Sequence, residues 1–96
     1  MSPKNKKKLD IIRKKLDQID NQLLAIIKKR TLLVNEVVKL KENKSEIVDQ
    51  KRISSILKNI KAKSIKNNID PKITNRIWKN MIWSYINYER RNFKKK

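Results

Sequence analysis

The residues of this chain that could do chemistry are cations, carboxylates and hydroxyl groups. The sequence contains neither Cys nor His, which excludes disulfides, thiol nucleophiles, imidazole bases and nearly every zinc or iron site. We therefore expect no metal ion and no other cofactor. Lys and Arg side chains are suited to binding an anion.

Arg30 interrupts a row of apolar residues that recur in steps of three and four. The members of the row are Leu9, Ile12, Leu16, Ile19, Leu23, Ile26, Leu33, Val37 and Leu40, and Arg30 occupies the step between Ile26 and Leu33. A guanidinium in such a seam is costly without a partner. Two explanations stay open: a salt bridge or register-setting polar residue, or a cavity in which Arg30 binds an anion.

Lys41 and Arg13 are two further cations on the same predicted helix. Lys41 follows Arg30 by about 16 Å along the axis, on a similar face, so the two could bind opposite ends of one small molecule. Alternatively, Lys41 is a solvated lysine at a helix C-terminus, where the dipole favours it. Arg13 precedes Arg30 by about 25 Å and cannot reach the same ligand within one subunit. If two copies pair antiparallel about residue 23 or 24, Arg13 falls opposite residue 34, between Arg30 and Lys41 of the other copy.

The elements that position these residues are predicted to be helices. The chain has no Gly and only two Pro, so it lacks the turn residues of hairpins and barrels. The apolar row predicts a helix over about 6–41, and the polar segment 42–48 is predicted to be a loop. Asp49 is an N-cap candidate for a helix over about 49–66, which Asn67 and Asn68 end. Asp70 and Pro71 start a third helix over about 71–91, with basic ends beyond it.

The net charge of +18 raises the alternative of a basic helical module that binds nucleic acid. Most lysines stand singly on polar helix faces, however, and Lys is one of three abundant residue types with AT-rich codons, so we disfavour nucleic acid as the main partner. The longest apolar stretches are far too short to span a membrane, and the N-terminus is too charged for a signal peptide. We expect a soluble, cytoplasmic protein.

Four stretches of the sequence together resemble one enzyme family. They are Ile12–Leu24, then Lys29-Arg30 with Glu36-Val37 and Lys41, then Asp49-Gln50-Lys51-Arg52, and Ile69-Asp70-Pro71 followed by Ile77-Trp78, Ile82 and Ile86-Asn87-Tyr88-Glu89. In this order and near this spacing they resemble the all-helical chorismate mutases over nearly the whole chain.

The resemblance implies an all-α fold in which a three-helix subunit, one domain over residues 1–96, forms an intertwined antiparallel homodimer. Arg13 of one chain would join Arg30, Lys41, Arg52 and Glu89 of the other. The substrate would be chorismate, a compact dicarboxylate that is rearranged to prephenate in the biosynthesis of phenylalanine and tyrosine. This rearrangement is unimolecular and needs orientation and charge stabilisation rather than a nucleophile or a base.

The implied roles follow from side-chain chemistry. Arg13, Arg30 and Arg52 would bind and orient the carboxylates, because arginine forks match them. Lys41 would donate a hydrogen bond to the ether oxygen, where negative charge develops as the C–O bond breaks. Glu89 matches a position that is Gln or Glu in the family and would face the same oxygen, so it would have to act in its protonated form. The alternative for Glu89 is an exposed pair with a neighbouring cation.

Two positions depart from the family's pattern. Many of these mutases have a Glu directly after the Arg that Arg52 matches, where it binds the ring hydroxyl, but this chain has Ile53. On the third helix, this chain has Tyr85 at a position where a small Ser is expected. Both changes, and the short spacing from Lys41 to Arg52, are similar to isochorismate pyruvate lyases, which share the fold but give salicylate and pyruvate. Alternatively, Ile53 is a helix-packing residue, and backbone groups near Asp49 bind the ring hydroxyl. For Tyr85, the alternative is that the ring packs in the protein while its hydroxyl binds a substrate carboxylate.

Overall fold

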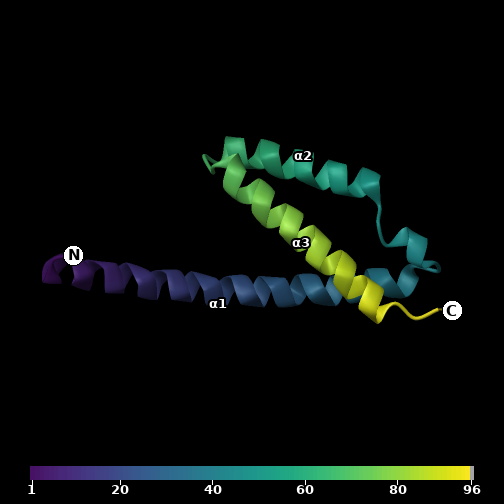
Figure 1. Cartoon of the computed structure of the whole chain (residues 1–96), viewed down its shortest axis with the longest axis horizontal. Helices are drawn as coiled ribbons and strands as arrows, with labels where there is room; N and C mark the ends of the chain where they lie inside the picture. The colour runs from purple at the N-terminus through teal and green to yellow at the C-terminus, as the bar shows by residue number, and fades with distance from the viewer. Residues whose placement is uncertain (96) are drawn as a thin grey trace. The chain divides into compact units, whose positions relative to one another are not determined.

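The structure is a computed structural model, and it describes residues 1–95. Its elements are the α-helices α1 (Pro3–Leu40), α2 (Gln50–Lys66) and α3 (Pro71–Asn92), with a short 3-10 helix, η1 (Lys44–Glu46), between α1 and α2 (Figure 1). No strand occurs in residues 1–95, which confirms the prediction of an all-helical fold with three helices. Lys96, the last residue of the predicted basic end, lies outside the described residues.

The chain divides into two compact units, Met1–Leu33 and Val34–Lys96. The first unit consists of the N-terminal part of α1. The helix begins at Pro3 rather than near residue 6, because the residue before it caps the helix. The Ser2 hydroxyl accepts a hydrogen bond from the Asn5 backbone N–H at 3.2 Å, and Pro3 at the first helical position needs no acceptor for an N–H.

The apolar row of the first unit lies open to solvent. Ile12, Leu23 and Leu33 are 54%, 51% and 61% exposed, and Leu16, Ile19 and Ile26 fall within the same range. A soluble protein rarely leaves a continuous apolar stripe of this length uncovered. The repeating steps of three and four are typical of helices that pair with another helix.

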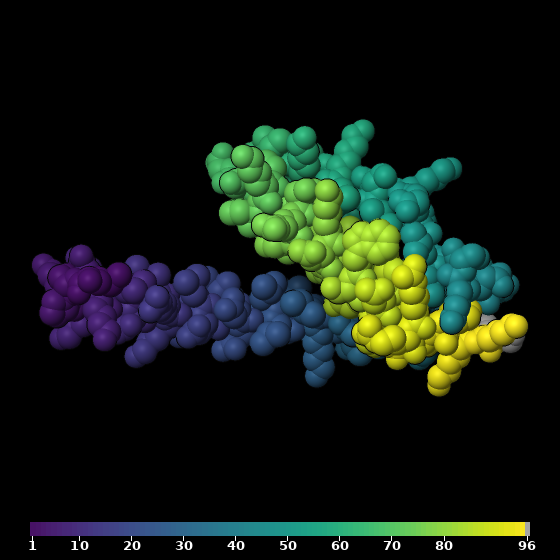
Figure 2. Space-filling view, viewed as in Figure 1, coloured from purple at the N-terminus to yellow at the C-terminus, as the bar shows by residue number. Residues whose placement is uncertain are grey.

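The second unit has a core between α2 and α3, which pack directly against each other (Figure 2). Ile47, Ile82 and Ile86 are buried at its centre, and the partly buried residues around them are Val48, Ile53, Ile56, Leu57 and Phe93. Ile82 and Ile86 lie four residues apart and share one face of α3. The segment predicted to be a loop holds η1, which brings Ile47 into this core.

Side-chain caps fix where α2 and α3 begin, as the sequence predicted. The Asp49 side chain accepts a hydrogen bond from the Arg52 backbone N–H at 3.0 Å, and the Asp70 side chain accepts one from the Lys72 N–H at 2.9 Å. Pro71 occupies the first turn of α3. These contacts satisfy N–H groups that have no partner within the helix.

The turn between the two helices is built around Asn68, which has a left-handed backbone with φ of 56°. The N–H of Asn68 donates to Ile65 O, and the N–H of Ile69 donates to Ser64 O at 2.9 Å, which together form a Schellman motif. Below the turn, the buried hydroxyl groups of Ser64 and Thr74 lie 2.7 Å apart and share a hydrogen bond. The chain has no Gly, so Asn, the next most tolerant residue, takes the left-handed position.

Replacing Asn68 with valine is expected to lower the free energy of unfolding by about 1–2 kcal/mol, because a β-branched residue resists positive φ. Asn68→Gly should leave stability unchanged or raise it. Urea unfolding followed by circular dichroism, at one protein concentration, measures both. Asn59→Val, the same replacement at an exposed position of α2, is the control and should cost less than about 0.5 kcal/mol. Equal losses for the two valine variants would contradict the strain argument.

None of the helices within residues 1–95 combines the length and the apolar character that crossing a bilayer requires.

Candidate functional site

The second unit brings together two of the residues predicted to form the site, Lys41 and Glu89. Lys41 Nζ donates a hydrogen bond to Glu89 Oε1 at 3.0 Å, and the two groups also form an ion pair. The side chains are only 19% and 9% exposed, respectively. Lys41 is thus not a solvated lysine at a helix end, and Glu89 is not in an exposed pair. Both alternatives are corrected by the structure.

Local folding explains why these two side chains meet. Lys41 directly follows the last residue of α1, and its N–H donates to Val38 O. Glu89 lies three residues after Ile86 and seven after Ile82, so it falls on the face of α3 that packs into the core. Packing of that face draws the carboxylate out of water, so Glu89 is buried at 7% exposure, and the polar residues Ser64 and Thr74 are buried as well.

The electrostatics of the pair follow from this burial. A buried carboxylate is strongly destabilised without a partner, and a cation at 3.0 Å provides one. Any anion that binds beside Lys41 therefore competes with Glu89 for the same ammonium, and a proton on Glu89 would remove that competition.

Asp49 and Arg52 lie at the start of α2, close together in the sequence and in space. The Asp49 carboxylate is used by the cap, where it accepts from the Arg52 backbone N–H. The side chains of both residues are exposed. Arg52 therefore has its guanidinium available at the surface of the second unit, while Asp49 has a structural task that would compete with binding a ligand through the same oxygen.

Ile53, the departure that follows Arg52, packs against the core formed by Ile47, Ile82 and Ile86. The explanation of this position as a helix-packing residue is therefore confirmed. An apolar residue here has a structural reason that is independent of the substrate.

Tyr85 is half-buried on α3, and its ring meets the ring of Tyr88 edge to face, with centroids 6.2 Å apart at 81°. The Tyr88 hydroxyl donates to Asn35 Oδ1 of α1 at 2.6 Å. Tyr85 thus takes part in aromatic packing with Tyr88. That the Tyr85 hydroxyl binds a carboxylate stays a prediction.

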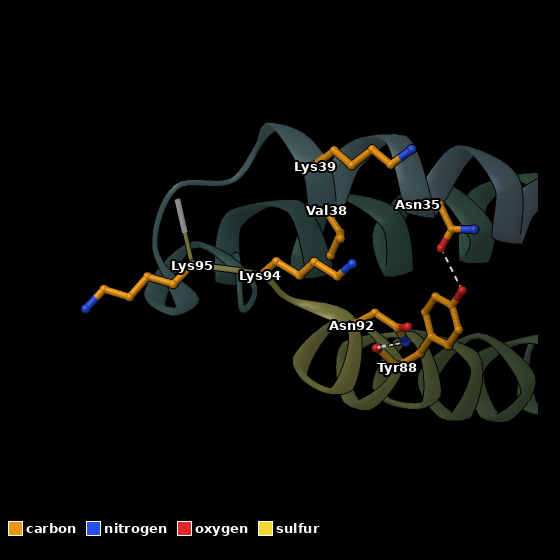
Figure 3. Close-up of a pocket in the computed structure, with 7 residues that line it drawn as sticks. All are labelled: Asn35, Val38, Lys39, Tyr88, Asn92, Lys94 and Lys95. Atoms are coloured by element: carbon orange, nitrogen blue, oxygen red, sulfur yellow. Dashed lines mark hydrogen bonds between the residues drawn. The ribbon is translucent and has the colours of Figure 1, made fainter.

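A cavity of about 460 Å³ lies beside the hydrogen bond between Tyr88 and Asn35. Its lining residues are Asn35, Val38, Lys39, Tyr88, Asn92, Lys94 and Lys95. Figure 3 shows Lys94 extending between Val38 and Asn92, whereas Lys95 points away from the other residues. The lining includes neither Lys41 nor Glu89.

The Asn35–Tyr88 bond, which joins α1 to α3, was not predicted from the sequence. The type of residue 35 could have indicated it, because Asn is unfavourable in helix interiors and its side chain often makes a hydrogen bond when it occurs there. Finding its partner requires the tertiary structure, since Tyr88 lies 53 positions further along the chain.

Arg13 and Arg30, the remaining predicted site residues, belong to the first unit. Arg13 is exposed and Arg30 is half-buried on α1. Within residues 1–95, no group of three or more acidic residues is gathered in a way that could hold a metal ion. The described residues offer Lys and Arg side chains for binding an anion, with one buried carboxylate beside Lys41.

An all-helical subunit with a buried Lys–Glu pair, an exposed heptad seam and no thiol or imidazole defines a class of small helical proteins suited to binding anions. The family model for chorismate mutase type II matches residues 12–90, and the chain belongs to this family. The matched range includes every residue predicted to form the site. Comparisons with curated proteins and with solved structures gave no match.

Proposed function

We propose that this protein is a chorismate mutase that converts chorismate to prephenate. The observation that carries the proposal is the part-buried Lys41–Glu89 pair, found in a chain of the chorismate mutase type II family. The reaction needs a donor aimed at the ether oxygen, because negative charge builds there as the C–O bond breaks and the new C–C bond forms. Lys41 is the donor in this proposal, and Glu89 contacts the same oxygen in its protonated form.

The three arginines hold the substrate in the compact conformation that reacts. Arg30 and Arg52 of one chain bind carboxylates of the substrate, and Arg13 is contributed by the partner chain. Paired N–H groups of a guanidinium fix both the position and the plane of a carboxylate, which restricts the substrate to a geometry close to the transition state. Backbone groups near Asp49 bind the ring hydroxyl, and the Tyr85 hydroxyl donates a hydrogen bond to a substrate carboxylate.

The proposed assembly is an antiparallel homodimer paired along α1. It is supported by the exposed apolar row of the first unit, whose members through Leu33 are at least half exposed from Ile12 onward. A second copy offers the same row in the same spacing, and a two-fold contact covers both rows at once. Each dimer then contains two equivalent sites.

An isochorismate pyruvate lyase is the second candidate, because Ile53 stands where many mutases have a Glu. Packing of Ile53 in the core gives that residue another explanation, so we rank the lyase second. Purified protein incubated separately with chorismate and with isochorismate, with products identified by chromatography, separates the two. Prephenate from chorismate supports the mutase, whereas salicylate with pyruvate from isochorismate replaces it with the lyase. No turnover of either substrate would exclude both the mutase and the lyase.

Glu89→Gln is expected to change the pH profile rather than abolish the reaction. In the wild type, kcat/KM should fall as pH rises, because ionised Glu89 repels the developing charge on the ether oxygen and holds Lys41. Gln has the same shape and a permanent N–H donor, so its profile should be flat on the alkaline side. Glu42→Gln, which removes an exposed carboxylate, is the control and should keep the wild-type profile. An alkaline limb that persists in Glu89→Gln would exclude this role for Glu89.

A further inference from the structure

One face of α3 has a line of cations with an aromatic residue among them. Lys72, Arg76, Lys79, Trp83, Asn87 and Arg90 follow one another in steps of three or four, so they lie on one side of the helix over about 27 Å. We call this set the α3 basic stripe. All six residues are exposed, and the stripe runs along the edge of the buried face that carries Ile82 and Ile86.

The surroundings of the stripe contain almost no negative charge to oppose it. From Gln50 to Tyr88 the only acidic residue is Asp70, and its carboxylate is held by the N-cap hydrogen bond to Lys72 N–H. The next acid, Glu89, is buried and paired with Lys41. The α2–α3 pair therefore presents a continuous positive potential, which attracts polyanions.

Trp83 gives the stripe a chemistry beyond charge. It is 45% exposed, and it stands four residues after Lys79 and four before Asn87, so cations and amides flank the indole on one line. No chorismate chemistry has been assigned to it, and its apolar area is not used in the core. An exposed indole between cations offers a flat surface on which a nucleic-acid base can stack, while the cations contact phosphates.

We propose that the α3 basic stripe is a binding site for single-stranded nucleic acid. Lys72, Arg76 and Lys79 contact the phosphates, and Trp83 stacks on an unpaired base. The distribution of charge along the sequence disfavoured nucleic acid as the main function, because most lysines stand singly. The spacing on α3 places four cations on one side of a helix, and the site is additional to the proposed mutase activity, which uses none of these residues.

Other anionic partners fit the stripe less well. An interfacial helix that lies on an anionic membrane needs a broad apolar face toward the lipid, but Ile82 and Ile86, the apolar residues that border the stripe, are buried in the core. A duplex hides its bases within the stack, so Trp83 would gain no partner there. A single strand offers phosphates to the cations and unpaired bases to the indole.

Fluorescence anisotropy of a labelled single-stranded oligonucleotide of about 20 nucleotides, which exceeds the usual site size, tests the proposal on the full chain. Neutralising three cations of the stripe with Lys72→Gln, Arg76→Gln and Lys79→Gln should raise Kd about tenfold or more. The slope of log K against log salt should fall by about 2, since each phosphate contact contributes about 0.7 for a single strand.

The matched control removes three exposed cations from α2, with Lys58→Gln, Lys61→Gln and Lys63→Gln. Net charge is then identical in the two triple variants, and the α2 variant should raise Kd less than about twofold. Trp83→Ala should weaken binding about fivefold or more, and binding to wild type should quench Trp fluorescence. Circular dichroism checks that each variant keeps its helix content.

Equal weakening by the two triple variants would overturn the proposal and leave only general attraction between a polycation and a polyanion. Equal affinity for a duplex of the same sequence, or an unchanged Kd in Trp83→Ala, would overturn it as well. The assay contains no chorismate, so its outcome is independent of the mutase assignment. The stripe variants should also retain the full rate of chorismate turnover.

Discussion

Replacing Lys41 with alanine is expected to lower kcat/KM for conversion of chorismate to prephenate by about 100- to 1000-fold, the usual effect of removing one donor aimed at developing charge. Most of the loss should be in kcat, because the contact to the ether oxygen strengthens in the transition state. Absorbance of chorismate, followed at saturating and at low substrate, measures both parameters. Lys44→Ala, which removes an exposed cation of η1, is the control and should keep the wild-type rate.

The buried pair complicates this test, since Lys41→Ala leaves the Glu89 carboxylate without a partner at 9% side-chain exposure. An unpaired buried charge costs several kcal/mol and could unfold the second unit. Combining Lys41→Ala with Glu89→Gln removes that charge and should restore thermal stability without restoring activity. A double variant within about tenfold of wild type would show that Lys41 acts only by holding Glu89, and the catalytic role would be wrong.

The elements of this fold follow well from local signals. Asp49, Asp70 and Pro71 each act within a few residues of their own position, so the starts of α2 and α3 can be read from the chain, and the structure has the hydrogen bonds that the sequence predicted. The apolar steps on α3 likewise indicate which face enters the core. The early start of α1 was missed because the cap formed by Ser2 lies outside the apolar row.

The site was predicted as a set of residues, but its geometry required the structure. Lys41 and Glu89 are 48 positions apart, and each has an ordinary explanation when considered alone. Only packing of α3 decides that the carboxylate is buried and that the ammonium is its partner. Conversely, Ile53 packs against the core, which gives this departure from the family's pattern a structural reason.

Arg13 is the residue whose role depends most on a second chain, because it lies about 25 Å before Arg30 on one helix. Two inactive variants should therefore complement each other. A heterodimer of an Arg13→Ala chain with a Lys41→Ala chain has one site that combines intact Lys41 from the first chain with intact Arg13 from the second. It should show about half of the wild-type activity per dimer, while each homodimer is inactive. Two affinity tags allow the co-expressed heterodimer to be purified.

The matched control places both substitutions in one chain and pairs it with a wild-type chain. The same two side chains are then missing from the dimer, but each site lacks one of them if Arg13 acts across the interface, so activity should be lost. If Arg13 served its own subunit, the result would be reversed: the wild-type chain would keep one full site in the control, and the first heterodimer would be inactive. The pair of measurements thus separates the two arrangements by opposite outcomes, even if the variants differ somewhat in stability.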